Sequence, residues 1–156
     1  MDTATIAHED PDSADARWCL ARYYDALSQS IGEPFDVSRS LDPDRDALRP
    51  PLGCFLIARS AGQAVGCCGL KGNGSDMGEI KRLWVSEAAR GQGLARRLMD
   101  AAEGRAQALG INCLRLDTNR TLTAAIAMYR ATGWTEIPAF NDEPYAHYWF
   151  EKRLVP

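Results

Sequence analysis

The sequence predicts an α/β protein with a mixed central β-sheet and helices on both faces. Two observations indicate this class. Short apolar runs typical of strands alternate with longer segments of helical spacing, and a glycine-rich turn joins a strand to a helix past the middle of the chain. No internal repeat or linker interrupts the pattern. The 156 residues are therefore expected to form one domain, residues 1–156, with its own buried core.

The first half of the chain contains the signals of a helix and a hairpin. The expected elements are a helix over 12–31, a loop over 36–51 with one helical turn at 44–48, and a β-hairpin of strands 54–58 and 64–70. Leu20, Leu27 and Ile31 recur at helical spacing, and Gly32 ends that helix. Prolines and charges disfavour a regular element in the loop, whereas the two apolar runs are separated by a polar turn, as in a hairpin.

The second half alternates strands and helices. The expected elements are a strand over 79–85, a helix over 93–109, a strand over 113–117, a helix from 122 to 133, and strands over 134–137 and 147–151. Leu94 and Leu98 belong to the inner stripe of the first of these helices, and Gly110 ends it. Tyr129 completes the apolar face of the second, which ends at Gly133.

Composition excludes several classes of protein. With 46% hydrophobic and 25% charged residues the chain is globular, and a net charge of −3 argues against extended nucleic-acid binding. It has neither an apolar run of membrane-spanning length nor a secretory signal, so a cytoplasmic protein is expected. Its five cysteines lack metal-ligand spacing. They predict buried reduced thiols and no metal site, with Cys67 and Cys68 on opposite faces of a strand.

The glycine-rich turn is the most informative segment. The sequence Arg90-Gly-Gln-Gly-Leu-Ala95 follows a strand and opens directly into a helix. Glycines let the backbone approach a ligand, and the first N–H groups of a helix have no internal acceptor, so an anion is favoured there. Arg90 and Arg96 add positive charge at the same end of the helix. The turn is therefore expected to bind a pyrophosphate.

Two other phosphate-binding motifs match the sequence of this turn less well. A P-loop needs Lys-Ser or Lys-Thr after the glycines, and neither follows here. A dinucleotide-binding turn needs a third glycine where Arg96 stands, and it follows the first strand of a parallel unit, whereas a hairpin precedes this turn. A turn that joins strand and helix without binding a ligand remains an alternative.

Three segments together resemble the GNAT (Gcn5-related) N-acetyltransferase superfamily. Arg90-x-x-Gly93-x-Ala95 resembles the family's Arg/Gln-x-x-Gly-x-Gly/Ala signature, whose turn binds the pyrophosphate of coenzyme A. Residues 79–85 resemble its central strand, and residues 117–134 its C-terminal half. The resemblance extends from about residue 53 to residue 154. It implies the GNAT fold, in which two splayed parallel strands hold acetyl-CoA between them.

The resemblance also implies which residues bind the cofactor. Leu83, Trp84 and Val85 would offer backbone hydrogen bonds to the pantetheine arm, although their side chains also suit an ordinary strand core. Asn119 fits a position that often contacts the cofactor, and it equally suits a helix N-cap. The pyrophosphate would lie at the turn formed by Arg90, Gly91, Gln92, Gly93, Leu94, Ala95 and Arg96.

Two residues are candidate catalytic groups by the same resemblance. Tyr129 corresponds to the tyrosine that often protonates the leaving CoA thiolate and also contacts the cofactor; the alternative is a plain core side chain. Glu79 stands where some members carry a catalytic carboxylate, and it could hold the water that removes the acceptor's proton. Its alternative is a solvated glutamate paired with Lys81 or Arg82. A base is needed because an amine of pKa about 10.4 is almost fully protonated at pH 7.

The segment 138–147 would border the acceptor. Asp142 and Glu143 could attract a cationic amine, and Phe140 and Tyr145 could pack against its apolar part. A solvated turn shaped by two prolines is the alternative. Trp149 or Phe150, exposed on an edge strand, could support a homodimer.

The leading hypothesis is direct transfer of acetyl from acetyl-CoA to a primary amine of a small molecule, peptide or protein. Transfer would occur in a ternary complex, with no metal and no covalent intermediate. One alternative is a GNAT-fold module that binds CoA as a sensor without catalysis, which the presence of both Glu79 and Tyr129 disfavours. Another is the same chemistry with a longer acyl-CoA. The identity of the acceptor is left open.

Overall fold

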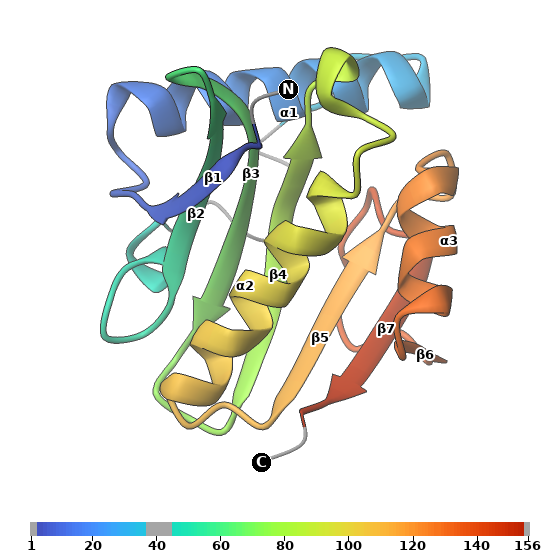
Figure 1. Ribbon diagram of the computed structural model, residues 1–156. Coiled ribbons are helices and arrows are strands. Elements are labelled where there is room, and N and C mark those ends of the chain that lie inside the picture. Colours follow the sequence, from blue (N-terminus) through green and yellow to red (C-terminus); the bar gives the residue numbers. More distant parts are fainter. Residues whose placement is uncertain (1–2, 37–44, 155–156) are drawn as a thin grey trace.

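The computed structural model describes residues 3–36 and 45–154 as a seven-stranded sheet with helices on both faces (Figure 1). The strand order is β1-β2-β3-β4-β5-β7-β6. The strands are β1 (Thr5–His8), β2 (Cys54–Ser60), β3 (Gln63–Gly72), β4 (Met77–Val85), β5 (Cys113–Thr118), β6 (Thr135–Ile137) and β7 (Tyr148–Arg153). The helices are α1 (Ala14–Ile31), α2 (Leu94–Ala108) and α3 (Thr123–Ala131), with short 3-10 turns η2 (Asp46–Leu48) and η3 (Glu87–Ala89). The predicted α/β class, with helices on both faces, is confirmed.

Helix α1 begins at a cap that its sequence provides. The Ser13 side chain accepts a hydrogen bond from the Ala16 amide at 3.1 Å, which satisfies one of the free donors of the first turn. The helix ends at Gly32, as predicted, where the backbone turns left-handed. Most of the expected loop over 36–51 lies outside the described residues, but its predicted helical turn is present as η2.

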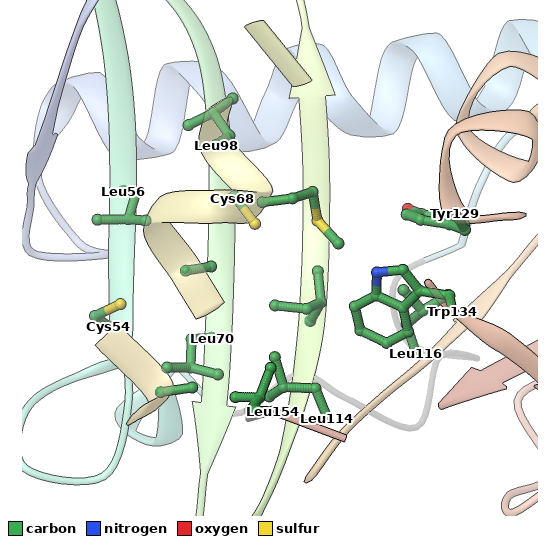
Figure 2. Close-up of a cluster of buried hydrophobic side chains, with 14 of the residues drawn as sticks. Cys54, Leu56, Cys68, Leu70, Leu98, Leu114, Leu116, Tyr129, Trp134 and Leu154 are labelled. Carbon is green, nitrogen blue, oxygen red and sulfur yellow. The ribbon is translucent and has the colours of Figure 1, made fainter. Parts of the chain in front are cut away.

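Two cores form because the central strands are apolar on both faces. Helices α2 and α3 cover one core, which includes Leu114 and Leu116 (Figure 2). Leu114 and Phe150 are fully buried in it. Helix α1 covers the other. Cys68 lies in the first core and Cys67 in the second, so the prediction of opposite faces is confirmed. All five cysteines are buried and free, also as predicted.

Strands β4 and β5 separate along their length. They run parallel, but only Met77–Glu79 pairs with Cys113–Arg115. No described residue of β4 beyond Glu79 pairs with β5, whereas β5 continues to pair with β7 as far as Thr118. Figure 1 shows the two strands diverging toward their C-terminal ends. The predicted pair of splayed strands is therefore present.

A β-bulge lies in the diverging half of β4. The β3–β4 register shifts between the pair Gly69–Lys81 and the pair Cys67–Trp84, so β4 has one extra residue in this interval. Arg82 within it has a φ of +56°, which is uncommon for a non-glycine residue. Such strain is often found at functional sites.

The bulge changes which side chains face α1. Ile80 and Leu83 both pack with the α2–α3 core, so Lys81 and Arg82 between them face the opposite side. The Arg82 Nε donates to the Tyr24 hydroxyl of α1 at 3.2 Å. Two consecutive cationic side chains thus lie on the α1 face, at the level where the strands separate.

Two features differ from the sequence expectations. The short strand β1, which pairs antiparallel with β2, was not predicted. The expectation of Trp149 or Phe150 exposed on an edge strand is wrong, because β7 lies between β5 and β6. Phe150 is fully buried, and the Trp149 Nε1 donates to the Asn141 Oδ1 at 2.9 Å. The basis for a homodimer at this strand is therefore removed.

Leu114 offers a test of the α2–α3 core. Its side chain has 0% exposure, and removing three buried carbons leaves a cavity that the strand cannot close. Leu114→Ala is expected to lower the free energy of unfolding by about 3 kcal/mol. Leu52→Ala, at a side chain with 36% exposure, is the control and should change it by less than about 1 kcal/mol. Chemical denaturation measures both, and equal losses would contradict the assignment of this core.

Candidate active site

A pocket occupies the space between the separated halves of β4 and β5. Helices α1 and α3, both strands, and the β6–β7 connection all contribute to its wall. The lining residues are Tyr23, Tyr24, Leu27, Phe35, Ile80, Lys81, Arg82, Leu83, Leu116, Asp117, Thr118, Asn119, Leu122, Ala125, Tyr129, Glu143 and Tyr145. We call this space the cleft.

The β4 main chain is open toward the cleft. Between Ile80 and Val85 the strand pairs with β3 on one side and, among the described residues, with nothing on the β5 side. The backbone N–H and C=O groups on that side are left for a ligand or water, apart from the Val85 carbonyl, which accepts a hydrogen bond from a side chain of the following turn. Of the three predicted pantetheine-binding residues, Leu83 lines the cleft, whereas the Trp84 ring is buried against Trp18 at 5.8 Å between centroids. An extended ligand could add to this edge as a strand would.

The predicted anion-binding turn has the required backbone. Gly91 and Gly93 have φ of +80° and +74°, a conformation that glycine adopts without strain. The Arg90 amide donates to Glu87 at 3.3 Å, and the Arg97 amide to Gly93 at 3.1 Å. Between them, the six amides of residues 91–96 donate to no acceptor among the described residues. They stand at the positive end of α2, where an anion binds best.

The turn is joined to the end of β4. The Arg90 Nε donates to the Val85 carbonyl at 3.3 Å, across η3. Gly93 is the N-cap of α2, with no side chain to occupy the free amides. The turn and the open edge of β4 are therefore consecutive parts of one chain segment, and a ligand with a diphosphate and a flexible arm could contact both.

Tyr129 projects from α3 into the cleft. The residue has 5% exposure, and its ring packs against Trp134 and Phe150. Its hydroxyl forms no hydrogen bond with the described residues and points toward β4 in Figure 2. Burial raises the pKa of Tyr129 above its ordinary value, because it disfavours the charged phenolate. Electrostatic interactions with Cys68, Tyr23 and Asp117 raise this pKa further. The phenol therefore stays protonated throughout the physiological pH range and can donate a hydrogen bond.

Glu79 lies just below the cleft and does not line it. It is the last β4 residue paired with β5, and its Oε2 is 3.1 Å from the Lys81 Nζ. Lys81 does line the cleft, and its Nζ is also 3.6 Å from the Asp117 Oδ2. The ion pair with Lys81, which was the alternative for Glu79, is thus present. A group in the cleft could interact with Glu79 through Lys81 or through water.

Asn119 lines the cleft but has two structural partners. Its Oδ1 accepts hydrogen bonds from the Thr121 amide at 3.0 Å and hydroxyl at 2.7 Å, and its Nδ2 donates to the Tyr145 carbonyl at 2.9 Å. The N-cap of α3 is Leu122, so Asn119 shapes the turn before the helix instead of capping it. It also ties α3 to the β6–β7 connection.

The β6–β7 connection places two of the four predicted acceptor residues in the cleft. Glu143 and Tyr145 line it and are buried. Asp142 is exposed outside it, and Phe140 packs beneath the Arg115 guanidinium at 5.4 Å. The rings of Phe35 and Tyr145 lie 4.3 Å apart, and the Asp36 amide donates to the Tyr145 hydroxyl at 3.0 Å. This connection thus forms an aromatic wall with the segment that follows α1.

Comparison with known proteins identifies the family. The model of the Acetyltransferase (GNAT) family matches residues 20–134. This chain belongs to the GNAT family of acetyltransferases. A protein named IAA acetyltransferase from Azospirillum brasilense is 32% identical over 146 residues, which are 93% of this chain and 92% of that protein. The putative acyl-CoA N-acyltransferase of Klebsiella pneumoniae has a TM-score of 0.80 and 30% identity, covering 98% of this chain and 99% of that one.

A protein with a similar fold has been solved in complex with coenzyme A. The PaiA N-acetyltransferase of Thermoplasma acidophilum, in complex with coenzyme A, has a TM-score of 0.72 over 96% of this chain and 99% of that one. At 15% identity this likeness concerns the fold alone. Within the described part of this GNAT chain, no helix is long and apolar enough to cross a membrane. The same residues contain no group of three potential metal ligands.

Sequence reasoning missed several polar residues at the cleft of this GNAT protein, among them Lys81, Arg82, Asp117 and Asn141. The Asn141 Nδ2 donates to the Asp117 Oδ2 at 2.9 Å, and its Oδ1 accepts from Trp149. The first three line the cleft, and Asn141 supports Asp117 from behind. In a regular strand, apolar and polar residues alternate, but here two charged residues, Lys81 and Arg82, stand in succession between Ile80 and Leu83. This irregularity was the sequence signal for the bulge and for the charges at the cleft.

Proposed function

We propose that this GNAT protein transfers the acetyl group of acetyl-CoA directly to a primary amine in a ternary complex. The observation that supports this most is the arrangement around one cleft. Six free amides, an open strand edge and the hydroxyl of the buried Tyr129 follow one another along its wall. This order corresponds to the diphosphate, pantetheine arm and thioester sulfur of acetyl-CoA. The coenzyme A in the PaiA structure is consistent with such a ligand.

The proposed cofactor contacts follow from the main chain. The amides of residues 91–96, assisted by the charges of Arg90 and Arg96, hold the diphosphate. The backbone of Leu83, Trp84 and Val85 bonds the pantetheine amides as an additional strand would. Asn119 contributes to the cofactor site by fixing the wall between α3 and the β6–β7 connection.

The proposed chemistry needs a proton donor and a proton acceptor. Acetyl-CoA supplies a thioester whose acetyl group passes to the amine nitrogen. Tyr129 donates a proton to the leaving thiolate, and its raised pKa keeps the phenol protonated until that moment. Glu79 accepts the proton lost by the amine, through a water, because its carboxylate lies below the cleft next to Lys81. Glu143 and Tyr145 border the acceptor, with Phe140 and Asp142 farther out on the same connection.

Release of free thiol from acetyl-CoA, measured against chemically diverse amines, tests this function. At least one primary amine should give steady thiol release and an acetylated product of the expected mass. Tight binding of CoA without turnover of any amine would instead indicate a CoA-binding sensor. Faster release from a longer acyl-CoA with the same amine would identify another donor.

Glu79→Gln tests the proposed base. The substitution keeps the shape of the side chain but removes the basic oxygen, so the turnover number should fall by about tenfold to a hundredfold. The rise of activity with pH should also shift, because the remaining route depends on free amine in solution. Glu103→Gln, which removes an ion pair with Lys152 away from the cleft, is the control. A wild-type pH profile in Glu79→Gln would remove the assignment.

A further inference from the structure

We propose that Asp117 binds the ammonium group of the acceptor, so that this enzyme selects cationic amines. The inference rests on the proposed acetyl transfer and adds the residue that recognises the acceptor. Asp117 follows the point where β4 and β5 part, two residues beyond the last pair, Glu79–Arg115. Its neighbour Leu116 packs in the α2–α3 core, so the Asp117 side chain faces the α1 side of the cleft.

The carboxylate of Asp117 is held through one oxygen. Its Oδ2 accepts from the Asn141 Nδ2 at 2.9 Å and lies 3.6 Å from the Lys81 Nζ. The orientation of the Asn141 amide is determined by its other contacts, since its Oδ1 accepts from the Trp149 Nε1 at 2.9 Å and the Glu143 amide at 3.2 Å. The Asp117 Oδ1 accepts no hydrogen bond from the described residues. A charged donor in the cleft could bond to it.

The charges around Asp117 favour a cation. Lys81 lies between Asp117 and Glu79, so these three side chains together carry one negative formal charge. The other charged residues of the cleft, Arg82 and Glu143, are opposite in sign and cancel formally. Among the described residues, the cleft lining and the Glu79 carboxylate below it therefore carry a net negative formal charge, which attracts an ammonium group. Lys81 repels an ammonium group less than a lone cation would, because the carboxylates of Glu79 and Asp117 flank the Lys81 Nζ.

Asp117 is also close to the reacting end of the cleft. Burial is the main cause of the raised pKa of Tyr129 and of Tyr23, and the charge of Asp117 contributes to both. The Tyr129 hydroxyl is an independent sign of a ligand here, because it belongs to a buried residue, borders the cleft and has no partner among the described residues. In this proposal the ammonium held at Asp117 loses one proton through water to Glu79, and the free amine then attacks the thioester carbonyl carbon while the leaving thiolate takes a proton from Tyr129.

Asp117→Asn tests this assignment by separating binding from turnover. The amide keeps the size of the side chain and removes the charge, so the KM for an alkylamine should rise by roughly 10- to 100-fold, with kcat changing less. A hydrazide of the same carbon skeleton, which is uncharged at the assay pH, should show little change in KM. If Asp117 had only a structural role, the substitution would raise the KM for the alkylamine and for the hydrazide by the same factor.

Two further variants complete the test. Asn141→Ala leaves the Asp117 carboxylate free to turn, so it should shift the KM in the same direction by a smaller factor. Glu151→Gln is the matched control, because Glu151 lies on the same face of the sheet, pairs with Arg115 at 2.9 Å and does not line the cleft. It should leave the KM of the alkylamine within about twofold.

Calorimetry keeps this inference separate from the proposed function. Binding of the alkylamine to the CoA-loaded protein should weaken at least tenfold in Asp117→Asn, while CoA affinity stays the same. If no amine is acetylated but this loss is seen, the proposed activity fails and the ammonium site stands. If amines are acetylated and Asp117→Asn binds the alkylamine as well as the wild type does, Asp117 is not the ammonium site.

Discussion

Tyr129→Phe is expected to lower the turnover number by about 100-fold, because general acid catalysis contributes that much or more. The substitution removes only the hydroxyl, which has no hydrogen-bond partner among the described residues. The ring stays packed between Trp134 and Phe150, so folding should be unaffected. The leaving thiolate would have to depart without a proton donor, whereas the affinity for CoA should change less than about threefold.

The control is Tyr148→Phe, at a half-buried tyrosine of β7 that does not line the cleft. Steady-state kinetics measure turnover for both variants, and calorimetry measures the affinity for CoA. Turnover equal to that of the wild type in Tyr129→Phe would make Tyr129 a plain core residue. Loss of turnover together with loss of CoA binding would indicate a cofactor contact instead of an acid.

Gly93→Asp should weaken CoA binding strongly, and Gly93→Asn should weaken it much less. A Cβ at Gly93 meets no atom within 4 Å, and Asn and Asp tolerate its φ of +74° better than other side chains do. The two variants differ by one negative charge at the N-terminus of α2. At roughly 6 Å from a diphosphate charge the repulsion is about 2–3 kcal/mol, or more than tenfold in affinity.

The comparison of Asp with Asn separates charge from shape. An acidic residue at the start of a helix is favourable for folding, so the loss of affinity cannot be attributed to an unstable α2. The difference between the variants should shrink as salt is added, because the site is exposed. Equal CoA affinities for the two variants would mean that no phosphate charge lies at this turn.

Local patterns in the sequence predicted most of the fold. Gly32 and Gly133 marked helix ends, and the spacing of apolar residues located both long helices. The glycine turn before α2 was predictable because its backbone conformation depends on consecutive residues. Strand β1 was not, because it has four residues that are mostly exposed and show no burial pattern. The order of β7 and β6 depends on long-range pairing, so the supposed edge strand turned out to be internal.

The part of the cleft around Asp117 was less predictable for the same reason. Asp117 and Asn141 are 24 residues apart and meet only because β5 pairs with β7 and the β6–β7 connection folds back. The bulge at Arg82 depends on a register shift against β3. Glu79 was predicted to be a catalytic residue from its place in the strand. Whether its side chain lines the cleft, however, depends on where β5 diverges from β4. Such features follow from tertiary pairing and have no local signature.

Calorimetry with coenzyme A and with pantetheine measures the central claim most directly. Pantetheine has the same arm and thiol but lacks the diphosphate, so it can contact β4 and not the amides of residues 91–96. Coenzyme A should bind with a micromolar Kd, and pantetheine should bind at least tenfold more weakly, a difference of about 1.4 kcal/mol or more. Absence of heat with millimolar coenzyme A, or equal affinity for the two ligands, would contradict diphosphate binding by this turn.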